Sequence, residues 1–195
     1  MESLPLLARG EALDVSEEAR LVRAAESDPA AFASLYRRYV APIYRYLYWR
    51  LGHAADAEDV TAQVFTEALE RLSGYRERGS FAAWLFTIAR RRAADYYRRQ
   101  RAHAALDEKA LQRQSSGSDP LRDALRSESL QRLAQLVAGL DAEKQELLRL
   151  RFAGGLSYKE IAAVVGSSEA AVKMAVHRLL RRLRAAWNES DGGER

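Results

Sequence analysis

Residues 156–178 read LSYKEIAAVVGSSEAAVKMAVHR, and they combine a helix start, a tight corner and a second, basic helix. Ser157 stands three residues before Glu160, the spacing at which a serine caps a helix while the glutamate reaches back to the serine. Gly166 falls where the chain has to turn, and a residue without Cβ adopts a positive φ there more readily than any other. The stretch predicts a helix-turn-helix.

The two helices of this motif have an apolar side and a polar side. At helical spacing, the side expected to face inward carries Ile161, Val165, Val172 and Val176. The outer face of the second helix, which such a motif lays into a major groove, carries Ser168, Glu169, Lys173, Met174 and His177. Arginines continue along the same helix as far as Arg184, a stripe that favours phosphate. The plainer alternative is a helical hairpin whose basic face is only solvated.

The composition of the 195-residue chain is that of an ordinary folded protein, with 48% hydrophobic and 30% charged residues. It contains no cysteine, which excludes disulfides, thiolate metal sites and thiol nucleophiles. No apolar run is long enough for a membrane span and no signal peptide is evident, so we expect a cytoplasmic protein without membrane insertion. The net charge of +4 hides basic blocks at 90–101 and 173–184 and an acidic one at 56–59, which indicates different partners for different faces.

Capping residues and apolar spacing predict further helices before this motif. Asp28 and Pro29 open the first of them, and Pro42 is expected to kink it or to break it into two helices. Asp56 is expected to cap the next helix, which ends near Ser73.

The segments that follow alternate between loop and helix. The polar segment 75–80 is predicted to be a loop, with Ser80 as the cap of a long helix that becomes basic and aromatic towards Arg101. Asp141 is expected to cap a further helix that runs through Phe152 and leads into the helix-turn-helix.

The domain organisation follows from a loss of periodicity in the middle of the chain, where the run 112–118 is typical of a flexible tether. We predict an N-terminal helical domain at 19–102, a linker at 103–122 and a C-terminal helix-turn-helix domain at 123–187. No stretch demands a strand. The predicted fold is all-α, with two small helical domains joined by a flexible linker, and these domains are able to fold against each other in the free protein.

Four motifs in this order resemble a bacterial RNA polymerase sigma factor of the extracytoplasmic-function type. DPAAFASLYRRY at 28–39 is similar to the opening helix of that family, and DAEDVTAQVF at 56–65 resembles its polymerase-binding segment. FAAWLFTIAR at 81–90 and DYYRR at 95–99 resemble the segment that melts and reads the minus-ten promoter element. The helix-turn-helix is similar to the module that reads the minus-thirty-five element.

The resemblance implies that the acidic helix docks on the clamp helices of the large polymerase subunit. The residues that would do so are Asp56, Asp59, Gln63 and Glu67. Acidic residues at this point also suit a helix N-terminus without any partner, because they interact favourably with the helix dipole.

The resemblance further implies that the loop 75–80 captures a flipped base of the non-template strand while arginines of the next helix hold the backbone. Aromatic faces and cations suit that task, and Tyr96 and Tyr97 cannot both be buried because successive helix residues diverge by about 100°. Trp84 suits the core instead. The expected minus-ten residues are Tyr75, Arg76, Arg78, Ser80, Arg91, Arg92, Tyr97, Arg98 and Arg99.

At the minus-thirty-five element, Lys173 suits guanine edges, Met174 a thymine methyl group and Glu169 a cytosine, whereas His177 reads a base or touches a phosphate. Ala171 and Ala175 depart from the commonest family pattern, so base readout stays open. The outer-face residues expected at the minus-thirty-five element are Ser168, Glu169, Lys173, Met174 and His177. Phosphate contacts are expected from Tyr158, Lys159, Arg178, Arg181 and Arg182.

The function implied is promoter-specific initiation with core RNA polymerase, on duplex and single-stranded promoter DNA, restrained by an anti-sigma factor. No catalysis, cofactor or metal is expected, because the three histidines lie far apart and no phosphate loop or nucleophile elbow occurs. The main alternative is a dimeric helix-turn-helix regulator of double-stranded operators, which has no need of a loop and helix suited to single strands. A metal-dependent nuclease and a basic amphipathic membrane binder explain fewer features.

Overall fold

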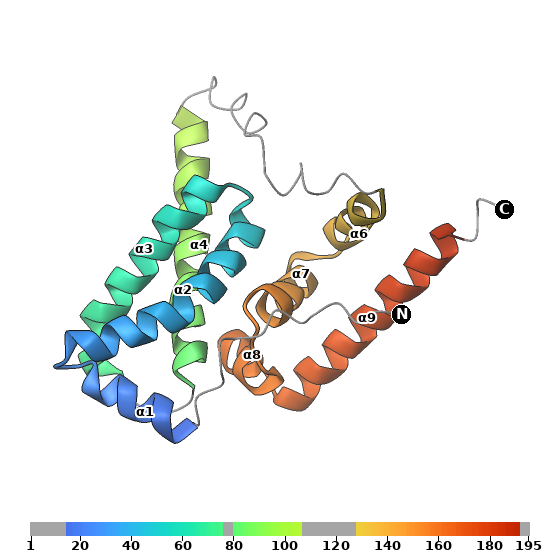
Figure 1. The fold of residues 1–195 in the computed structure, drawn as a ribbon. Coiled ribbons are helices and arrows are strands. Elements are labelled where there is room, and N and C mark those ends of the chain that lie inside the picture. Colours follow the sequence, from blue (N-terminus) through green and yellow to red (C-terminus); the bar gives the residue numbers. More distant parts are fainter. Residues whose placement is uncertain (1–14, 76–79, 107–127, 192–195) are drawn as a thin grey trace.

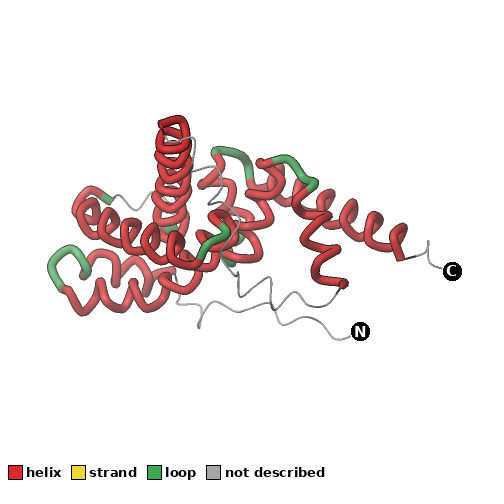
Figure 2. Tube along the Cα trace, turned by 90° about the horizontal axis from the view of Figure 1, so that it is seen from above, coloured by secondary structure: helices red, strands yellow, loops and turns green. Residues whose placement is uncertain are grey.

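The computed structural model describes residues 15–75, 80–106 and 128–191, and every regular element in these ranges is helical (Figure 1, Figure 2). The N-terminal half contains α1 (Val15–Ala24), α2 (Pro29–Leu51), α3 (Ala54–Arg71), the 3-10 turn η1 (Leu72–Gly74) and α4 (Phe81–Leu106). The C-terminal half contains α6 (Glu128–Ala138), α7 (Ala142–Leu148), the π-helix η3 (Arg149–Ala153), α8 (Tyr158–Val165) and α9 (Glu169–Asp191). The described residues confirm the all-α prediction, and most of the expected linker lies outside them.

Local signals set both ends of α2. Asp28 accepts a hydrogen bond from the backbone N–H of Ala30 at 2.8 Å, and Pro29 occupies the first turn, where its missing N–H costs nothing. At the other end Gly52 has φ 82° and donates its N–H to the carbonyl of Tyr48. This left-handed conformation favours glycine and reverses the chain directly after the helix.

Two expectations about this half need correction. The helix α2 does not break at Pro42, which is buried between core residues; packing of the surrounding side chains outweighs the missing N–H. Asp56 does not cap α3, because the helix already begins at Ala54 and Asp56 lies in its first turn. His53 takes the cap position without a side-chain hydrogen bond, since Gly52 turns the chain so sharply that α3 starts early.

Two helices of the C-terminal half, α7 and α8, begin where the capping signals predict. Asp141 accepts the backbone N–H of Lys144 at 2.9 Å and so caps α7. Ser157 and Glu160 form both hydrogen bonds of the capping box at the start of α8. Gly166 has φ 72° and forms the corner between α8 and α9. The helix-turn-helix prediction is therefore confirmed in its local detail.

The helix that was expected to run through Phe152 is α-helical only to Leu148 and then widens into η3.

The two halves share one hydrophobic core. Directly after η3, Gly154 lies against the ring of Phe86 in α4. Figure 1 shows α8 beside the first turns of α4, and η3 packs on α2. The halves of the free chain are thus folded against each other.

Candidate nucleic-acid interface

The outward face of α9 carries residues that were expected at the minus-thirty-five element. Val172 and Val176 are buried beneath it and fix the helix on α8. The expected residues Ser168, Glu169, Lys173, Met174 and His177 are all exposed. Ser168 also accepts the backbone N–H of Ala171 at 3.2 Å, so it caps α9. On α8 the buried valine is Val164, whereas Val165, expected inside, is only half-buried.

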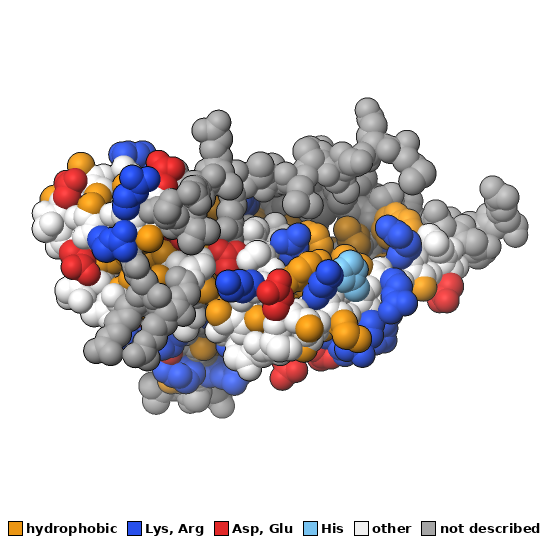
Figure 3. Space-filling view, turned by 90° about the horizontal axis from the view of Figure 1, so that it is seen from below, with side chains coloured by type: hydrophobic (Ala, Val, Ile, Leu, Met, Phe, Trp, Pro, Cys, Tyr) orange, Lys and Arg blue, Asp and Glu red, His pale blue; other side chains and the backbone are white. Residues whose placement is uncertain are grey.

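Basic side chains surround this face. Lys159, Arg178, Arg181 and Arg182 are exposed, and Figure 3 shows basic side chains gathered over α9 on the right of the molecule, beside a histidine. A row of exposed arginines on one helix attracts the phosphates of a nucleic-acid backbone. The surface has the charge that DNA binding requires.

Tyr158 links this surface to the π-helix. Its ring lies 6.1 Å from the ring of His177, and the guanidinium of Arg151 lies 4.8 Å from the Tyr158 ring centroid. Arg151 also donates to the carbonyl of Leu156 at 2.8 Å. Arg151 was not among the expected residues, because its contact with Tyr158 depends on the η3 geometry and leaves no pattern in the sequence. Arg151 therefore packs on the ring of Tyr158, which is an expected phosphate-contacting residue.

The loop expected to capture a base is anchored at both described ends. The ring of Tyr75 packs against Phe81 and Trp84, at centroid distances of 5.7 and 5.0 Å. Trp84 is half-buried against the core, as expected. Ser80 donates a hydrogen bond to Glu160 in α8 at 2.7 Å, which ties the loop to the helix-turn-helix. Arg76 and Arg78 lie outside the described residues.

Glu67 lies inside the protein, contrary to its expected place among the polymerase-docking residues. Its side chain is 2% exposed, and its carboxylate binds the guanidinium groups of Arg71, Arg91 and Arg92. Arg71 comes from α3, and Arg91 and Arg92 come from α4. We call these four residues the Glu67 cluster.

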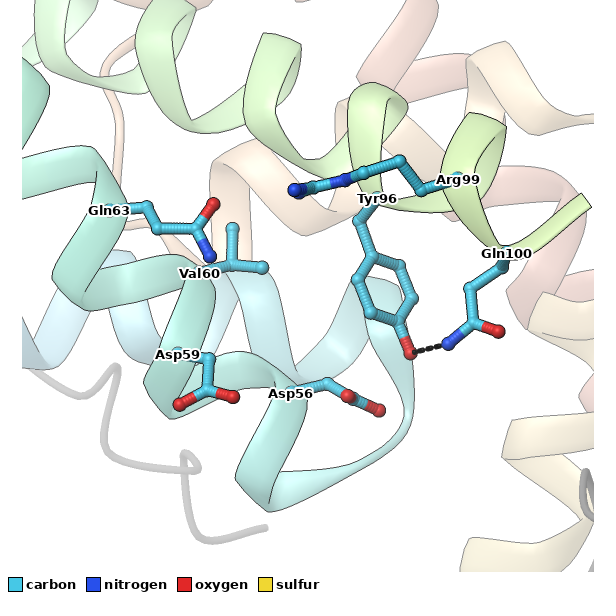
Figure 4. Close-up of a pocket in the computed structure, with 7 residues that line it drawn as sticks. All are labelled: Asp56, Asp59, Val60, Gln63, Tyr96, Arg99 and Gln100. Atoms are coloured by element: carbon cyan, nitrogen blue, oxygen red, sulfur yellow. Dashed lines mark hydrogen bonds between the residues drawn. The ribbon is translucent and has the colours of Figure 1, made fainter. Parts of the chain in front are cut away.

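A pocket of about 320 Å³ lies between α3 and the second half of α4 (Figure 4). Its lining combines expected polymerase-docking residues of α3 with residues of α4: Asp56, Asp59, Val60, Gln63, Tyr96, Arg99 and Gln100. Gln100 donates to the hydroxyl of Tyr96 at 2.9 Å. Burial, together with a hydrogen bond to Asp56, raises the pKa of Tyr96 to about 12. The two expected surfaces therefore meet at one place.

The remaining expected minus-ten residues lie on the exposed surface of α4. Tyr97 is 39% exposed and donates its hydroxyl to the carbonyl of Arg50. Arg98 pairs with Asp95 at 2.6 Å, and Arg99 is exposed at the rim of the pocket. As the sequence requires, one tyrosine of the pair is accessible while Tyr96 is half-buried.

A buried carboxylate joins the two halves. Glu146 of α7 accepts the hydroxyl of Tyr46 at 2.7 Å and pairs with Arg50 at 2.6 Å, both on α2. Arg90 and Arg149 approach the same carboxylate at 3.7 and 3.8 Å. Burial and the charge of Glu146 raise the pKa of Tyr46 far above its ordinary value, so its hydroxyl stays protonated and donates.

Within the described ranges, no three His, Asp or Glu side chains converge in a way that could hold a metal ion. None of the helices found there is both long enough and apolar enough to cross a membrane.

Comparison with known proteins gives the two halves separate matches. The family model of Sigma-70 region 2 matches residues 35–103, and that of Sigma-70 region 4 matches residues 130–183. The solved structure of CnrH in complex with the cytosolic domain of CnrY is 25% identical, with a TM-score of 0.65, and the match covers 88% of this chain and 97% of that one.

Two relatives match across both halves. BldN, an ECF RNA polymerase sigma factor of Streptomyces coelicolor, is 36% identical over 86% of this chain and 66% of its own length. SigD, an ECF RNA polymerase sigma factor of Mycobacterium tuberculosis, is 35% identical over 90% of this chain and 84% of its own length. With both regions present in this order, the chain belongs to the extracytoplasmic-function (ECF) family of RNA polymerase sigma factors.

Proposed function

We propose that the chain is a promoter-specificity subunit that joins core RNA polymerase and directs initiation at promoters. The observation that carries the proposal is the presence, on one chain, of a region 2 half and a region 4 half whose expected DNA-facing residues are largely exposed. Such a subunit has no catalysis of its own and needs no cofactor. It acts in the cytoplasm, where polymerase and promoter DNA are.

The polymerase-docking surface is the outward side of the first turns of α3. Asp59 is exposed there, and Asp56 and Gln63 are half-buried at the same pocket. Together they offer carboxylate and amide oxygens to the clamp helices of the large subunit. Glu67 has no part in this surface because its carboxylate is buried.

The two DNA surfaces divide the work of promoter recognition. In the minus-ten surface, the loop between Tyr75 and Ser80 captures a base, and arginines of α4 together with Tyr97 hold the separated strand. In the minus-thirty-five surface, Lys173, Met174 and their neighbours on α9 read the major groove, and the arginines around them position the helix on phosphates.

Use of both surfaces requires the halves to separate. In the closed arrangement Ser80 donates to Glu160, and Arg90 reaches the carbonyl of Val164 at 3.3 Å, so the loop and α4 are engaged by the helix-turn-helix. Polymerase and promoter DNA that bind only the separated halves would shift the chain from the closed arrangement to the open one.

An inhibitory protein partner is the remaining part of the proposal. CnrH, which has a similar structure, was solved in complex with the cytosolic domain of CnrY. We infer that this chain also binds an anti-sigma factor, which restrains it until a signal arrives. Co-purification with a protein that blocks transcription by this chain would support this inference.

The test of the function is reconstitution with core polymerase that lacks any other specificity subunit. We expect the wild-type chain to be captured and to start run-off transcription on a subset of a promoter library. Asp59→Lys should abolish capture, while Glu143→Lys, the same charge reversal at an exposed site on α7, should not. The proposal fails if the wild-type chain neither binds nor initiates. Specific binding of the isolated chain to a palindromic operator would favour the dimeric regulator instead.

A further inference from the structure

The Glu67 cluster holds three guanidinium groups around one buried carboxylate. Arg71 Nε lies 3.1 Å from Glu67 Oε1 and Arg92 Nε lies 2.5 Å from Oε2, while Arg91 binds Oε1 as well. The carboxylate therefore bridges α3 and α4. A buried carboxylate with three cationic partners has its lone pairs satisfied, so its burial is compatible with a stable fold.

The cluster has a net positive charge, and its cationic groups are the part exposed to solvent. Three guanidinium groups against one carboxylate leave a net charge of +2. The arginine side chains are 57%, 47% and 31% exposed, for Arg71, Arg91 and Arg92 respectively, whereas Glu67 is 2% exposed. A ligand approaching from solvent meets the cations and not the acid. Guanidinium groups of this kind suit phosphate oxygens.

The geometry depends on the acid. Arg91 and Arg92 are consecutive in α4, so their side chains leave the helix about 100° apart. Three guanidinium groups that converge would repel each other without an anion between them. By binding both arginines, Glu67 draws them to the α3 side of the helix, next to Arg71.

We propose that Arg71, Arg91 and Arg92 form a binding site for a phosphodiester group of the promoter strand, and that Glu67 is its positioning residue. The inference rests on the proposed function and extends it, because it adds Arg71 to the DNA-contacting residues and gives Glu67 a role within the DNA surface. Arg91 and Arg92 stand on α4 between Ser80, at the described end of the base-capturing loop, and Tyr97, so the site would hold the backbone between those two contacts.

The deciding variant is Glu67→Gln, because the competing explanations predict different changes in its affinity for DNA. It keeps the shape of the side chain and raises the net charge of the protein by one. If charge alone mattered, DNA would bind more tightly. If Glu67 only stabilised the fold, affinity would be unchanged once the protein is folded. If Glu67 positions the arginines, affinity should fall roughly 5- to 10-fold, as expected when charge-assisted contacts are lost.

The measurement is the affinity of the reconstituted holoenzyme for forked promoter DNA with a single-stranded minus-ten segment, followed by fluorescence anisotropy at several salt concentrations. The matched control is Glu70→Gln, which makes the same charge change at an exposed position of α3. It should leave affinity unchanged or raise it slightly. Equal or tighter binding by Glu67→Gln would overturn the proposal.

A second variant decides the matter if Glu67→Gln does not fold at the working temperature. Arg71→Gln alters a side chain that is 57% exposed, so the fold should tolerate it. It should weaken binding to all sequences. It should also lower the salt slope, the slope of log affinity against log salt concentration, by about one. An unchanged slope would overturn the proposal. Failure of the wild-type holoenzyme to bind the fork would refute the proposed function itself, whereas wild-type binding with insensitive variants refutes only this inference.

Discussion

Gly154 lies so close to Phe86 that a Cβ at its α-carbon would come 2.6 Å from Cε1 of the ring. The same Cβ would lie 2.9 Å from Cζ of the ring and 3.0 Å from the carbonyl oxygen of Leu150. Gly154 has φ −78°, which any residue adopts, so the contact and not the backbone conformation requires glycine. This residue reports how closely the two halves approach.

Gly154→Ala should therefore weaken the packing of the halves by about 1–3 kcal/mol, the usual effect of forcing a methyl group into a packed contact. Small-angle scattering should show a larger radius of gyration for the free chain. In Gly139→Ala the new Cβ would meet its nearest atoms at 3.6 and 3.7 Å, which is ordinary contact, so this control should stay compact. An equally compact Gly154→Ala would contradict the close approach.

Glu146 should be the polar residue on which the closed arrangement depends most. Its removal in Glu146→Ala leaves the half-buried Arg50 without its carboxylate, which typically costs about 3–5 kcal/mol. Tyr46→Phe removes one hydrogen bond and should cost about 1 kcal/mol. Urea unfolding of both variants and of the double variant measures the coupling. Because the two side chains share a bond, the combined loss should be smaller than the sum of the separate losses; strict additivity would speak against a shared network.

The helix starts at Asp28, Asp141 and Ser157 and the corner at Gly166 were predictable, because each depends on residues no more than a few positions apart. The start of α3 was not predictable in this way, because it depends on how Gly52 ends the preceding helix. The helix α1 leaves only a weak signal in the sequence, and packing on α2 stabilises it.

The candidate site divides in the same way. The outward face of α9 follows from helical periodicity alone, so Lys173 and Met174 were assigned correctly to an exposed surface. Glu67 was expected on an exposed docking surface but is buried, because its carboxylate binds Arg91 and Arg92, which are far along the chain and on another helix. Arg151 was missed for the related reason that a π-turn directs it onto Tyr158. Contacts made in the tertiary fold leave no local pattern.

Lys173 and Arg181 should have separable effects on promoter binding. Lys173→Ala removes a donor on the exposed side of α9 that is proposed to face the bases, and it should cost about 1–3 kcal/mol at cognate upstream elements, with little change at scrambled ones. Arg181→Ala should weaken binding to both and lower the salt slope by about one. Filter binding of holoenzyme to cognate and scrambled promoters across a salt series tests this division. If the affinity of both variants falls by the same factor for cognate and scrambled promoters, neither residue reads bases.

Tyr96 should lose its proton at a higher pH than an ordinary tyrosine does. Its pKa is raised from 10.0 to about 12, first by burial and then by its hydrogen bond to Asp56. Between pH 10 and 12 the unfolded chain therefore loses a proton that the folded chain retains. The stabilising contribution of Tyr96 is complete below pH 10 and decreases as the pH rises towards 12.

Ultraviolet titration of wild-type protein minus Tyr96→Phe isolates this group, with circular dichroism at each pH to verify that both proteins remain folded. The difference signal should have its midpoint near 12. Asp56→Asn should move that midpoint only part of the way towards 10, because burial, the larger cause, is retained. A wild-type midpoint near 10 would mean that Tyr96 is solvated and that α3 and α4 do not enclose the pocket as described. That pocket lies where the proposed polymerase-docking surface of α3 meets α4. When the titration is repeated with core polymerase bound, the midpoint should therefore rise further, because a partner that covers the pocket adds to the burial of Tyr96.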